Sequence, residues 1–474
     1  MSVKKIPFSI NSNCSIVILR MFIDKMRKFL LLLLLFIPFI SVAETRFVSI
    51  KECIDIGIQN SPDVAIEYEN QKIAEAGQRK VESQKKPSLS FDARTITEKI
   101  DTDSEEKERY KSLQFYKFED YKIGLFSGVS ARYKLLHPDY SSKLDLSKKN
   151  VELARLSEYI KKSEIILSIK KAYYNYLLSK HISALKAKIE ENYKKRLNVV
   201  SVLVKNGERP ILDLSTAEVN YARASLDYRK AKNDQDYRKK DLLASMGIFE
   251  IVEGDYDFLD IDEVAEFTLS LDSILELADN NSPLLMVAKY KKEMSRLEIA
   301  ISKAGDNLSV DVVGSLGYQN ETLYKRKYMK ENTDKKNWNL IYLFNIVASM
   351  PLYTGGAYSA SVDESIAKYN KESYNELSVS NDIKKKISAT YSMMVVMMDQ
   401  MKISKLNVEN ARTNLRLAQL SYDSGTGSQL TLQTAEYSLF QSEMEILNSK
   451  YEYLQNRAVL ANMIGVDEEL LCKK

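Results

Sequence analysis

The sequence holds few of the residues that interrupt helices or assemble small chemical sites. Its 474 residues include 15 glycines, 8 prolines, 3 cysteines, 2 histidines and 1 tryptophan. So few cysteines exclude a disulfide-rich scaffold, and neither His137 nor His181 has neighbours at the spacing of a zinc site. The sequence contains no phosphate-binding glycine loop and no Ser or Cys nucleophile with an evident histidine partner. These absences predict a protein with no enzymatic activity, metal or cofactor.

A basic and apolar leader accounts for most of the net charge of +4. Arg27 and Lys28 precede an apolar run at 29–40 and the small residues that end at Ala43, an order typical of a secretory signal peptide. We expect residues 1–43 to be removed, with 1–25 as an upstream extension. The alternative, a membrane anchor, needs about 20 apolar residues.

Removal of the leader nearly balances the charge. It takes away six of the 69 basic residues and one of the 65 acidic residues, so that 63 basic and 64 acidic residues remain. We find no retained basic stripe, and this argues against nucleic acid as a partner. Cys53 and Cys472 also remain, near opposite ends. They can form one disulfide in an oxidising compartment, but two separate thiols are the simpler interpretation.

Landmarks of the sequence recur at a spacing of 218 residues. Gly207 recurs as Gly425, and the sequence Thr-Ala-Glu at 216–218 recurs at 434–436. This spacing is far longer than the roughly 20–50 residues of a solenoid repeat. It therefore indicates a duplicated half-protein. We assign the first structural repeat to residues 44–265 and the second to residues 266–474.

Both repeats predict the same order of elements. Ser61-Pro62 and Ser282-Pro283 are typical helix starts, where serine caps the helix and proline takes its first position. Alternation of apolar and polar residues predicts strand hairpins at about 88–136 and about 307–353. Two stretches of 68 residues without Gly or Pro follow, and an apolar stripe runs along the first from Leu153 to Val204. We expect long antiparallel helical hairpins at about 139–246 and about 357–464.

The four strands are the only candidates for crossing a membrane, because no segment after the leader has the length of a transmembrane helix. Four strands cannot close a barrel, since membrane barrels begin at about eight. Membrane strands would therefore require an oligomer that pools them. The alternative is a small antiparallel sheet packed on a soluble helical body.

The sequence resembles the TolC-type outer-membrane efflux proteins. The resemblance rests on Pro351-Leu352-Tyr353-Thr354-Gly355-Gly356, on the paired Asn-Ser-Pro helix starts and on the glycines at the hairpin tips and helix ends, from about Ser49 to Val466. It implies a mainly α homotrimer in the cell outer membrane, in contact with its lipid. Each protomer would give four strands to a 12-stranded β-barrel and two hairpins to a trimeric α-barrel tunnel in the periplasm. The implied function is a passive exit channel for efflux or type I secretion, with a periplasmic adaptor and an inner-membrane efflux pump or ABC transporter as partners.

The resemblance also gives candidate functional residues. Pro351, Gly355 and Gly356 form the strand-to-helix junction. The candidates for the pore constriction and the adaptor contact at the tips are Gly207, Arg209, Asp213, Gly425, Gly427, Gln429, Thr431 and Thr434.

Two departures from the family pattern concern these sites. Thr431 and Thr434 occupy positions where the family has constricting aspartates, whereas the first copy keeps an acid, Asp213. We expect any charged constriction to come from Asp213 and Arg209; the alternative is that Asp213 only caps a helix. The first junction, residues 135–138, lacks the Gly-Gly pair, so we expect a different bend there. The rival function is a periplasmic coiled-coil adaptor or scaffold without a pore, a class that carries one hairpin rather than two.

Overall fold

The computed structural model describes residues 46–99, 121–249, 256–261, 264–324 and 338–471. The predicted signal peptide, residues 1–43, and Cys472 lie outside these ranges. The chain divides into a smaller unit, residues 1–48 with 252–258, and a larger unit that holds the rest. In the smaller unit, strand β1 (Arg46–Val48) pairs in parallel with β4 (Tyr256–Phe258). Sequence alternation did not predict this pair, because three residues are too few to show a period.

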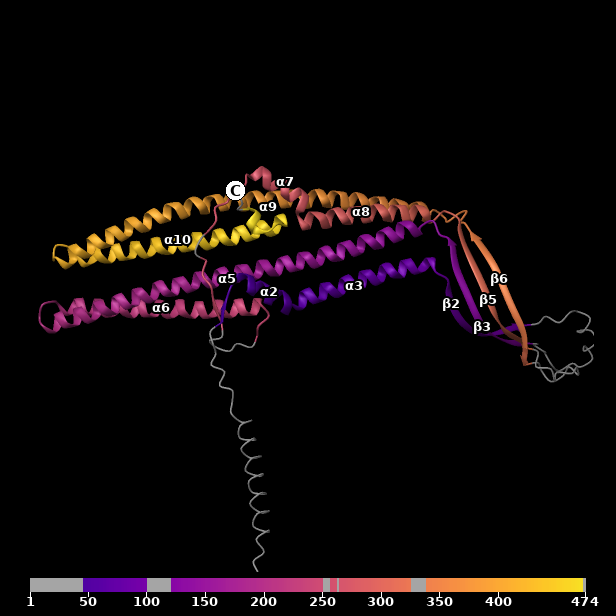
Figure 1. The fold of residues 1–474 in the computed structure, drawn as a ribbon, viewed down its shortest axis with the longest axis horizontal. Coiled ribbons are helices and arrows are strands. Elements are labelled where there is room, and N and C mark those ends of the chain that lie inside the picture. The colour runs from indigo at the N-terminus through magenta and orange to yellow at the C-terminus, as the bar shows by residue number, and fades with distance from the viewer. Residues whose placement is uncertain (1–45, 100–120, 250–255, 262–263, 325–337, 472–474) are drawn as a thin grey trace, which may run out of the picture. The chain divides into compact units, whose positions relative to one another are not determined.

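The larger unit consists of helices and one four-stranded sheet (Figure 1). Its helices are α2 (Ile50–Asn60), α3 (Pro62–Glu82), η1 (Ser83–Lys85), α5 (Tyr140–Lys205), α6 (Ile211–Ser245), α7 (Leu271–Asn281), α8 (Pro283–Ala304), α9 (Ala357–Asp423), α10 (Gln429–Ile464) and α11 (Glu468–Leu471). Its strands are β2 (Ser88–Lys99), β3 (Tyr121–Leu136), β5 (Ser309–Tyr324) and β6 (Trp338–Ser349). Of the helices in the described ranges, none combines the length and apolarity that a bilayer crossing requires.

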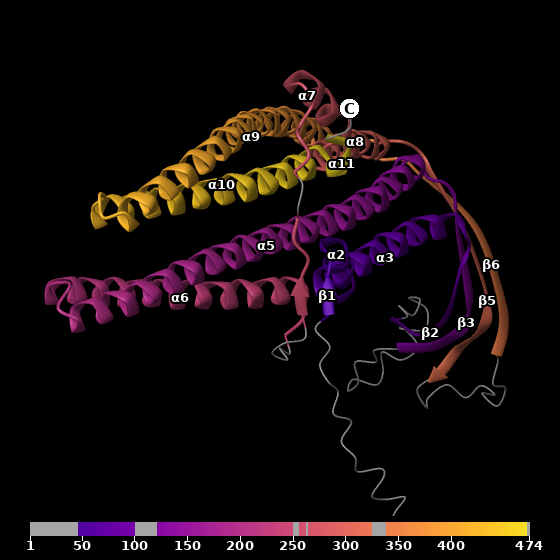
Figure 2. The same ribbon diagram turned by 60° about the vertical axis from the view of Figure 1, so that its left-hand side comes forward.

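Two long helical hairpins lie side by side in this unit (Figure 2). Helices α5 and α9 have 66 and 67 residues, as the two runs without glycine or proline predict. At about 1.5 Å per residue, each is about 100 Å long. Helix α6 packs along α5, α10 packs along α9, and α10 also contacts α5. The four helices therefore follow the order α6, α5, α10, α9, with α6 and α9 as the outer members.

The core is densest in the middle of α5. Ala172, Tyr173, Tyr174, Tyr176 and Leu177 are all buried there, so the single apolar stripe predicted for α5 is wrong in this stretch. Helices α2, α3, α6, α8 and α10 all contact α5. A helix with neighbours on several sides buries residues all round rather than on one face.

The sheet is antiparallel and has one apolar, exposed face. Its strand order is β2-β3-β5-β6. Phe91, Val129, Leu316 and Tyr342 lie opposite one another across the four strands, so their side chains share a face. All four are exposed. The other face carries Ser90, Ser130 and Ser315 at neighbouring positions. The predicted alternation is therefore confirmed for β2, β3 and β5, whereas β6 has exposed apolar residues on both faces, with Leu343 opposite Ser315.

Within each half, the Asn-Ser-Pro motif packs against the glycine that ends the returning helix. In the first half, Asn60 Nδ2 donates to Met246 O (3.3 Å), next to Gly247 with φ +75°. In the second half, a Cβ on Gly465 (φ +80°) would lie 2.6 Å from Asn281 O. The end of each returning helix thus packs on the junction between two short helices of its own half. This close approach and the positive φ explain why glycine occupies both helix ends.

The two predicted serine caps have different outcomes. Ser61 caps α3, since its Oγ accepts a hydrogen bond from Val64 N (3.4 Å). The prediction for Ser282 is wrong, because this side chain makes no capping bond to α8. Its Oγ is buried and has no hydrogen-bond partner among the described residues. Ser282 is only 1% exposed and lies between Asn281 and Pro283, both of which approach Gly465 at the end of α10.

We predict that Gly465→Ala lowers the free energy of unfolding by about 2–4 kcal/mol, because it adds a Cβ at positive φ and against a backbone oxygen. Gly77→Ala is the matched control. Gly77 lies inside α3, and an added Cβ there meets no atom within 4 Å, so a gain of up to about 1 kcal/mol is expected. Urea unfolding followed by far-ultraviolet circular dichroism measures both. Equal midpoints for the two variants would contradict the packing argument.

The segment between the two halves is held by α5. Tyr173 Oη donates to Leu259 O (2.5 Å), and His181 Nε2 lies 2.8 Å from Asp260 Oδ2. Burial raises the pKa of Asp260, but the hydrogen bonds from His181 and from Ile261 N outweigh burial and lower this pKa below its usual value. The carboxylate is therefore charged at neutral pH and anchors the segment to α5.

Cys53 is buried on α2 and forms no disulfide with any described residue. Burial raises the pKa of Cys53 to about 12, and the nearby charge of Glu52 adds to this effect. The thiol is therefore protonated at neutral pH and is a poor nucleophile. Because Cys472 lies outside the described residues, the choice between a disulfide and two separate thiols stays open.

Candidate functional site

The first hairpin tip, between α5 and α6, is charged. Gly207 follows the end of α5 with φ +78°, and Glu208 N donates to Leu203 O (2.9 Å), which closes the helix end. Arg209 Nη1 then lies 3.7 Å from Asp213 Oδ2. Both side chains are partly exposed, so this ion pair adds little stability.

Asp213 lies beside Arg209 and in the first turn of α6. Helix α6 begins at Ile211, after Pro210, and no side-chain hydrogen bond caps this start. The acid therefore has the position that the capping interpretation expects, without a capping hydrogen bond. A carboxylate in the first turn still interacts favourably with the helix dipole. The first tip thus presents one positive and one negative side chain within a single turn.

The second tip, between α9 and α10, presents hydroxyl groups instead of charges. Gly425 has φ +77°, and a Cβ on Gly427 would lie 2.9 Å from Ser421 Cβ. Ser428 Oγ accepts from Thr431 N (3.1 Å) and caps α10. The glycines therefore permit a tight turn that continues directly into a capped helix.

The two threonines of the second tip are bound locally. Thr431 Oγ1 lies 2.8 Å from Ser428 Oγ, and Thr434 Oγ1 donates to Leu430 O (2.8 Å). Gln429, the first residue of α10, is partly exposed. Both hydroxyls are thus engaged with their own helix start. The tips of the two repeats share a backbone turn but differ in charge.

Large apolar side chains are exposed at both tips. Ile211 and Leu212 in the first turn of α6, and Leu430 in the first turn of α10, are each more than 70% exposed. Both tips therefore combine a glycine turn with exposed apolar side chains.

A charged contact joins the two hairpins near their tips. Arg196 of α5 donates from Nη2 to Glu436 Oε1 (2.6 Å) and from Nη1 to Glu436 Oε2 (3.2 Å). The side chains are 16% and 23% exposed. Two-bond arginine–carboxylate pairs are among the stronger charged contacts. Sequence reasoning missed this pair, although Glu436 belongs to the repeated Thr-Ala-Glu landmark.

The second strand-to-helix junction bends at two glycines. After Pro351, Gly355 has φ +64° and Gly356 has φ +87°, and Gly356 precedes the first residue of α9. Tyr358 then fixes the helix start, because its Oη donates to Lys303 O (3.0 Å) of α8. The positive φ values are a conformation that glycine adopts without strain.

The first junction bends differently, as its sequence predicts. In the described ranges, no residue other than glycine has positive φ, so residues 135–138 turn without that conformation. Tyr140 N donates to His137 O (3.1 Å), and His137 Nε2 lies 3.0 Å from Asp311 Oδ1 of β5. This contact ties the junction of the first repeat to a strand of the second.

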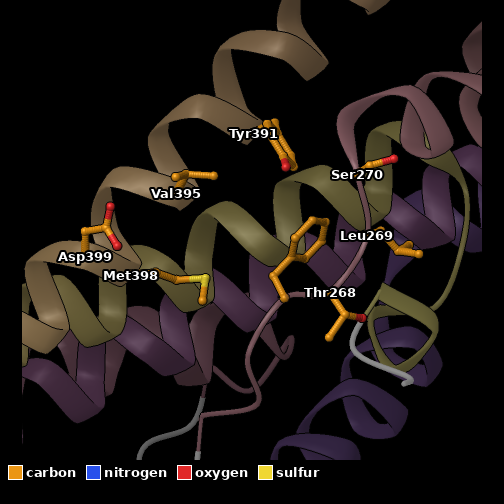
Figure 3. Close-up of a pocket in the computed structure, with 8 residues that line it drawn as sticks. Thr268, Leu269, Ser270, Tyr391, Val395, Met398 and Asp399 are labelled. Atoms are coloured by element: carbon orange, nitrogen blue, oxygen red, sulfur yellow. The ribbon is translucent and has the colours of Figure 1, made fainter.

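A pocket of about 310 Å³ lies between α9 and the segment before α7 (Figure 3). Tyr391, Val395 and Met398 line it from α9, and Thr268 and Ser270 line it from the segment. This lining lacks a grouping of catalytic side chains. Across the described part of the chain, no three potential metal ligands of the His, Cys, Asp or Glu type gather at one place. The tips and the junctions therefore remain the candidate sites.

Comparison with known proteins finds similar outer-membrane proteins. Residues 274–466 match the outer membrane efflux protein family. The outer membrane protein TolC of Vibrio cholerae is 21% identical over 357 residues, which cover 73% of this chain and 77% of that protein. The proteases secretion protein PrtF of Dickeya chrysanthemi is 22% identical over 274 residues, or 56% of each chain.

A solved structure shows the same fold. The outer membrane channel CmeC of Campylobacter jejuni superposes with a TM-score of 0.72 and 15% identity, covering 88% of this chain and 85% of that one. In sequence and in fold, this chain is similar to the TolC-type outer-membrane efflux proteins.

Proposed function

We propose that this chain is the outer-membrane exit channel of a multi-component efflux or type I secretion system. In this function it forms a homotrimer, which binds a periplasmic adaptor and passes cargo from an inner-membrane efflux pump or ABC transporter. The carrying observation is an exposed apolar sheet face whose strands lead into two long helical hairpins, the second of them through a glycine bend. The proposed role needs no catalytic step.

The sheet supports a membrane-embedded barrel made from several copies. Strands β2 and β6 have 12 residues each, and about 9–11 tilted residues suffice to cross a bilayer. The face with Phe91 and Tyr342 would contact lipid. Because β2 and β6 are edge strands, β6 of one copy can pair with β2 of the next. Three copies then supply the 12 strands that a closed barrel can use.

The outer helices support a closed ring of hairpins. Val219, Leu226 and Tyr237 of α6 are exposed, and so are Val396 and Ile403 of α9. These apolar side chains lie on the two outer members of the four-helix layer. Head-to-tail contact of α9 with α6 of the next copy would cover both, and such heterologous contacts close into rings. The duplicated repeats, 44–265 and 266–474, then place six similar hairpins around one axis.

The tips are proposed as the constriction and the adaptor contact. Arg209 and Asp213 would supply the charges, and Leu430 with the uncharged second tip would supply apolar and hydroxyl contacts. The rival interpretation, an adaptor or scaffold without a pore, leaves the exposed sheet face without a purpose. It also has no use for a second hairpin of the same length.

Purification and planar bilayer recording test this proposal. The mature chain should require detergent, have the native mass of a trimer and form discrete single channels after reconstitution. A water-soluble monomer without channel activity would contradict the proposal and favour the scaffold interpretation.

We predict that Asp213→Ala raises single-channel conductance more than Thr431→Ala does. Asp213 lies at the charged tip beside Arg209, whereas the Thr431 hydroxyl is bound to Ser428. An increase of about two-fold or more for the aspartate variant fits a charged constriction. Equal conductance in wild type and both variants would mean that neither side chain limits the pore.

A further inference from the structure

The two hairpins correspond position by position. Helices α5 and α6 span 140–205 and 211–245, and α9 and α10 span 357–423 and 429–464. Adding 218 to the bounds of the first hairpin gives the bounds of the second to within one residue. Every position in one hairpin therefore has a defined counterpart in the other, with no insertion along either helix.

This correspondence identifies the counterpart of the contact between α5 and α10. That contact joins the first helix of one hairpin to the second helix of the other. Its counterpart is a contact of α9 with α6. Within one chain these two helices are the outer members of the layer, so only α9 of one copy and α6 of the next can form it. We call the α5–α10 contact the internal seam and the α9–α6 contact the external seam.

The charged pair of the internal seam has no counterpart in the external seam. Arg196 corresponds to Asn414, and Glu436 corresponds to Glu218. Asn414 and Glu218 are both exposed in the chain, as expected for residues that await a partner copy. At this level the external seam sets a neutral amide against a carboxylate. Such a contact is weaker than a two-bond ion pair.

Halfway along the helices, one contact of the internal seam is polar and its counterpart in the external seam is apolar. In the internal seam, Gln455 Nε2 donates to Asn175 Oδ1 (2.8 Å). The counterparts in the external seam are Tyr237 and Met393, which are 61% and 48% exposed in the chain. A buried tyrosine–methionine contact gains from apolar burial and from sulfur–aromatic attraction. At this pair of positions the external seam is therefore more apolar than the internal seam.

We propose that the ring opens at its external seams near the tips and stays closed at those seams halfway along the helices. The internal seams keep the two hairpins of each copy together through Arg196 and Glu436. This proposal rests on the proposed trimeric channel, and its binding partner is a second copy of the same chain. Three weak and three strong seams then alternate around the axis.

Chemical crosslinking tests the external seam directly. A variant with Asn414→Cys and Glu218→Cys, in a Cys472→Ser background, is treated with a short bismaleimide, because seams bridged by long side chains exceed disulfide reach. Covalent species up to the trimer are expected. The matched control, Arg196→Cys with Glu436→Cys, should crosslink within one chain and keep the mass of one copy. If native mass gives a trimer but the first variant yields no covalent multimer, the seam assignment is overturned while the channel stands. A monomeric native mass overturns the proposed function itself.

Single-channel recording tests the claim about opening. Asn414→Arg places a cation opposite Glu218, as Arg196 lies opposite Glu436. We expect open probability to fall about two- to five-fold, the size of one modest ion pair. Adding Glu218→Gln should restore the wild-type value. Unchanged opening in Asn414→Arg, in a protein that crosslinks as expected, would overturn opening at the external seams.

Discussion

Replacing Glu468 with glutamine is expected to lower the free energy of unfolding by about 3–5 kcal/mol. Glu468 Oε1 lies 2.6 Å from Lys170 Nζ of α5, and Glu468 Oε2 lies 3.4 Å from Arg457 Nη2 of α10. The carboxylate is only 11% exposed. Glutamine keeps the shape but removes the charge, so two cations with little solvent contact lose their counter-ion. The short helix α11, which ends at the buried Leu471, would lose its anchor to both hairpins.

Glu191→Gln is the control for this prediction. Glu191 pairs with Lys195 at 2.8 Å, but the side chains are 63% and 70% exposed. Exposed pairs of this kind contribute about 0–1 kcal/mol. Urea titration of the helical signal compares the two variants. If both variants lose a similar free energy of unfolding, burial does not strengthen the contacts of Glu468 with Lys170 and Arg457.

Replacing Arg196 with glutamine is expected to raise the open probability of the reconstituted channel about ten-fold, equivalent to about 1.4 kcal/mol. The substitution removes both charged hydrogen bonds to Glu436 and leaves this carboxylate mostly buried without its cation. The hairpins of one copy then separate more readily near the tips.

Two further variants define what this result means. Adding Glu436→Gln to Arg196→Gln should produce little extra change, because the two residues act as one pair. Arg412→Gln removes an ion pair to Glu443 at 3.0 Å, which joins α9 to α10 within the second hairpin. It should leave opening unchanged. A rise in opening with Arg412→Gln as large as with Arg196→Gln would mean that any charge loss near the tips suffices.

Local pattern explains why much of the fold was predictable. The runs without glycine or proline bound α5 and α9, and alternation bounds the four strands, since both signals depend on neighbours within a few residues. The glycines at Gly207 and Gly425 mark turns for the same reason. The family resemblance rests on the order of these local signals along the whole chain.

Contacts between distant residues were not predictable. Arg196 and Glu436 are 240 residues apart, and no local period connects a lysine- and arginine-rich helix with one particular glutamate. The absence of a capping bond at Ser282 was not predictable either, because the local sequence Asn-Ser-Pro is the same as at Ser61, which does form one. The ion pair of Asp213 with Arg209 depends on the orientation of the Arg209 side chain, which the sequence alone does not give.

The open edges of the sheet have a consequence for biogenesis. Strands β2 and β6 each have a partner on one side only, and an unpaired strand edge can template the addition of any extended chain. The helical hairpins complete their hydrogen bonds within one copy, but the sheet cannot. A newly exported copy therefore has folded helical hairpins and a sheet with two unpaired edges. Copies must therefore be supplied fast enough for matching copies to meet before unrelated extended chains add to those edges.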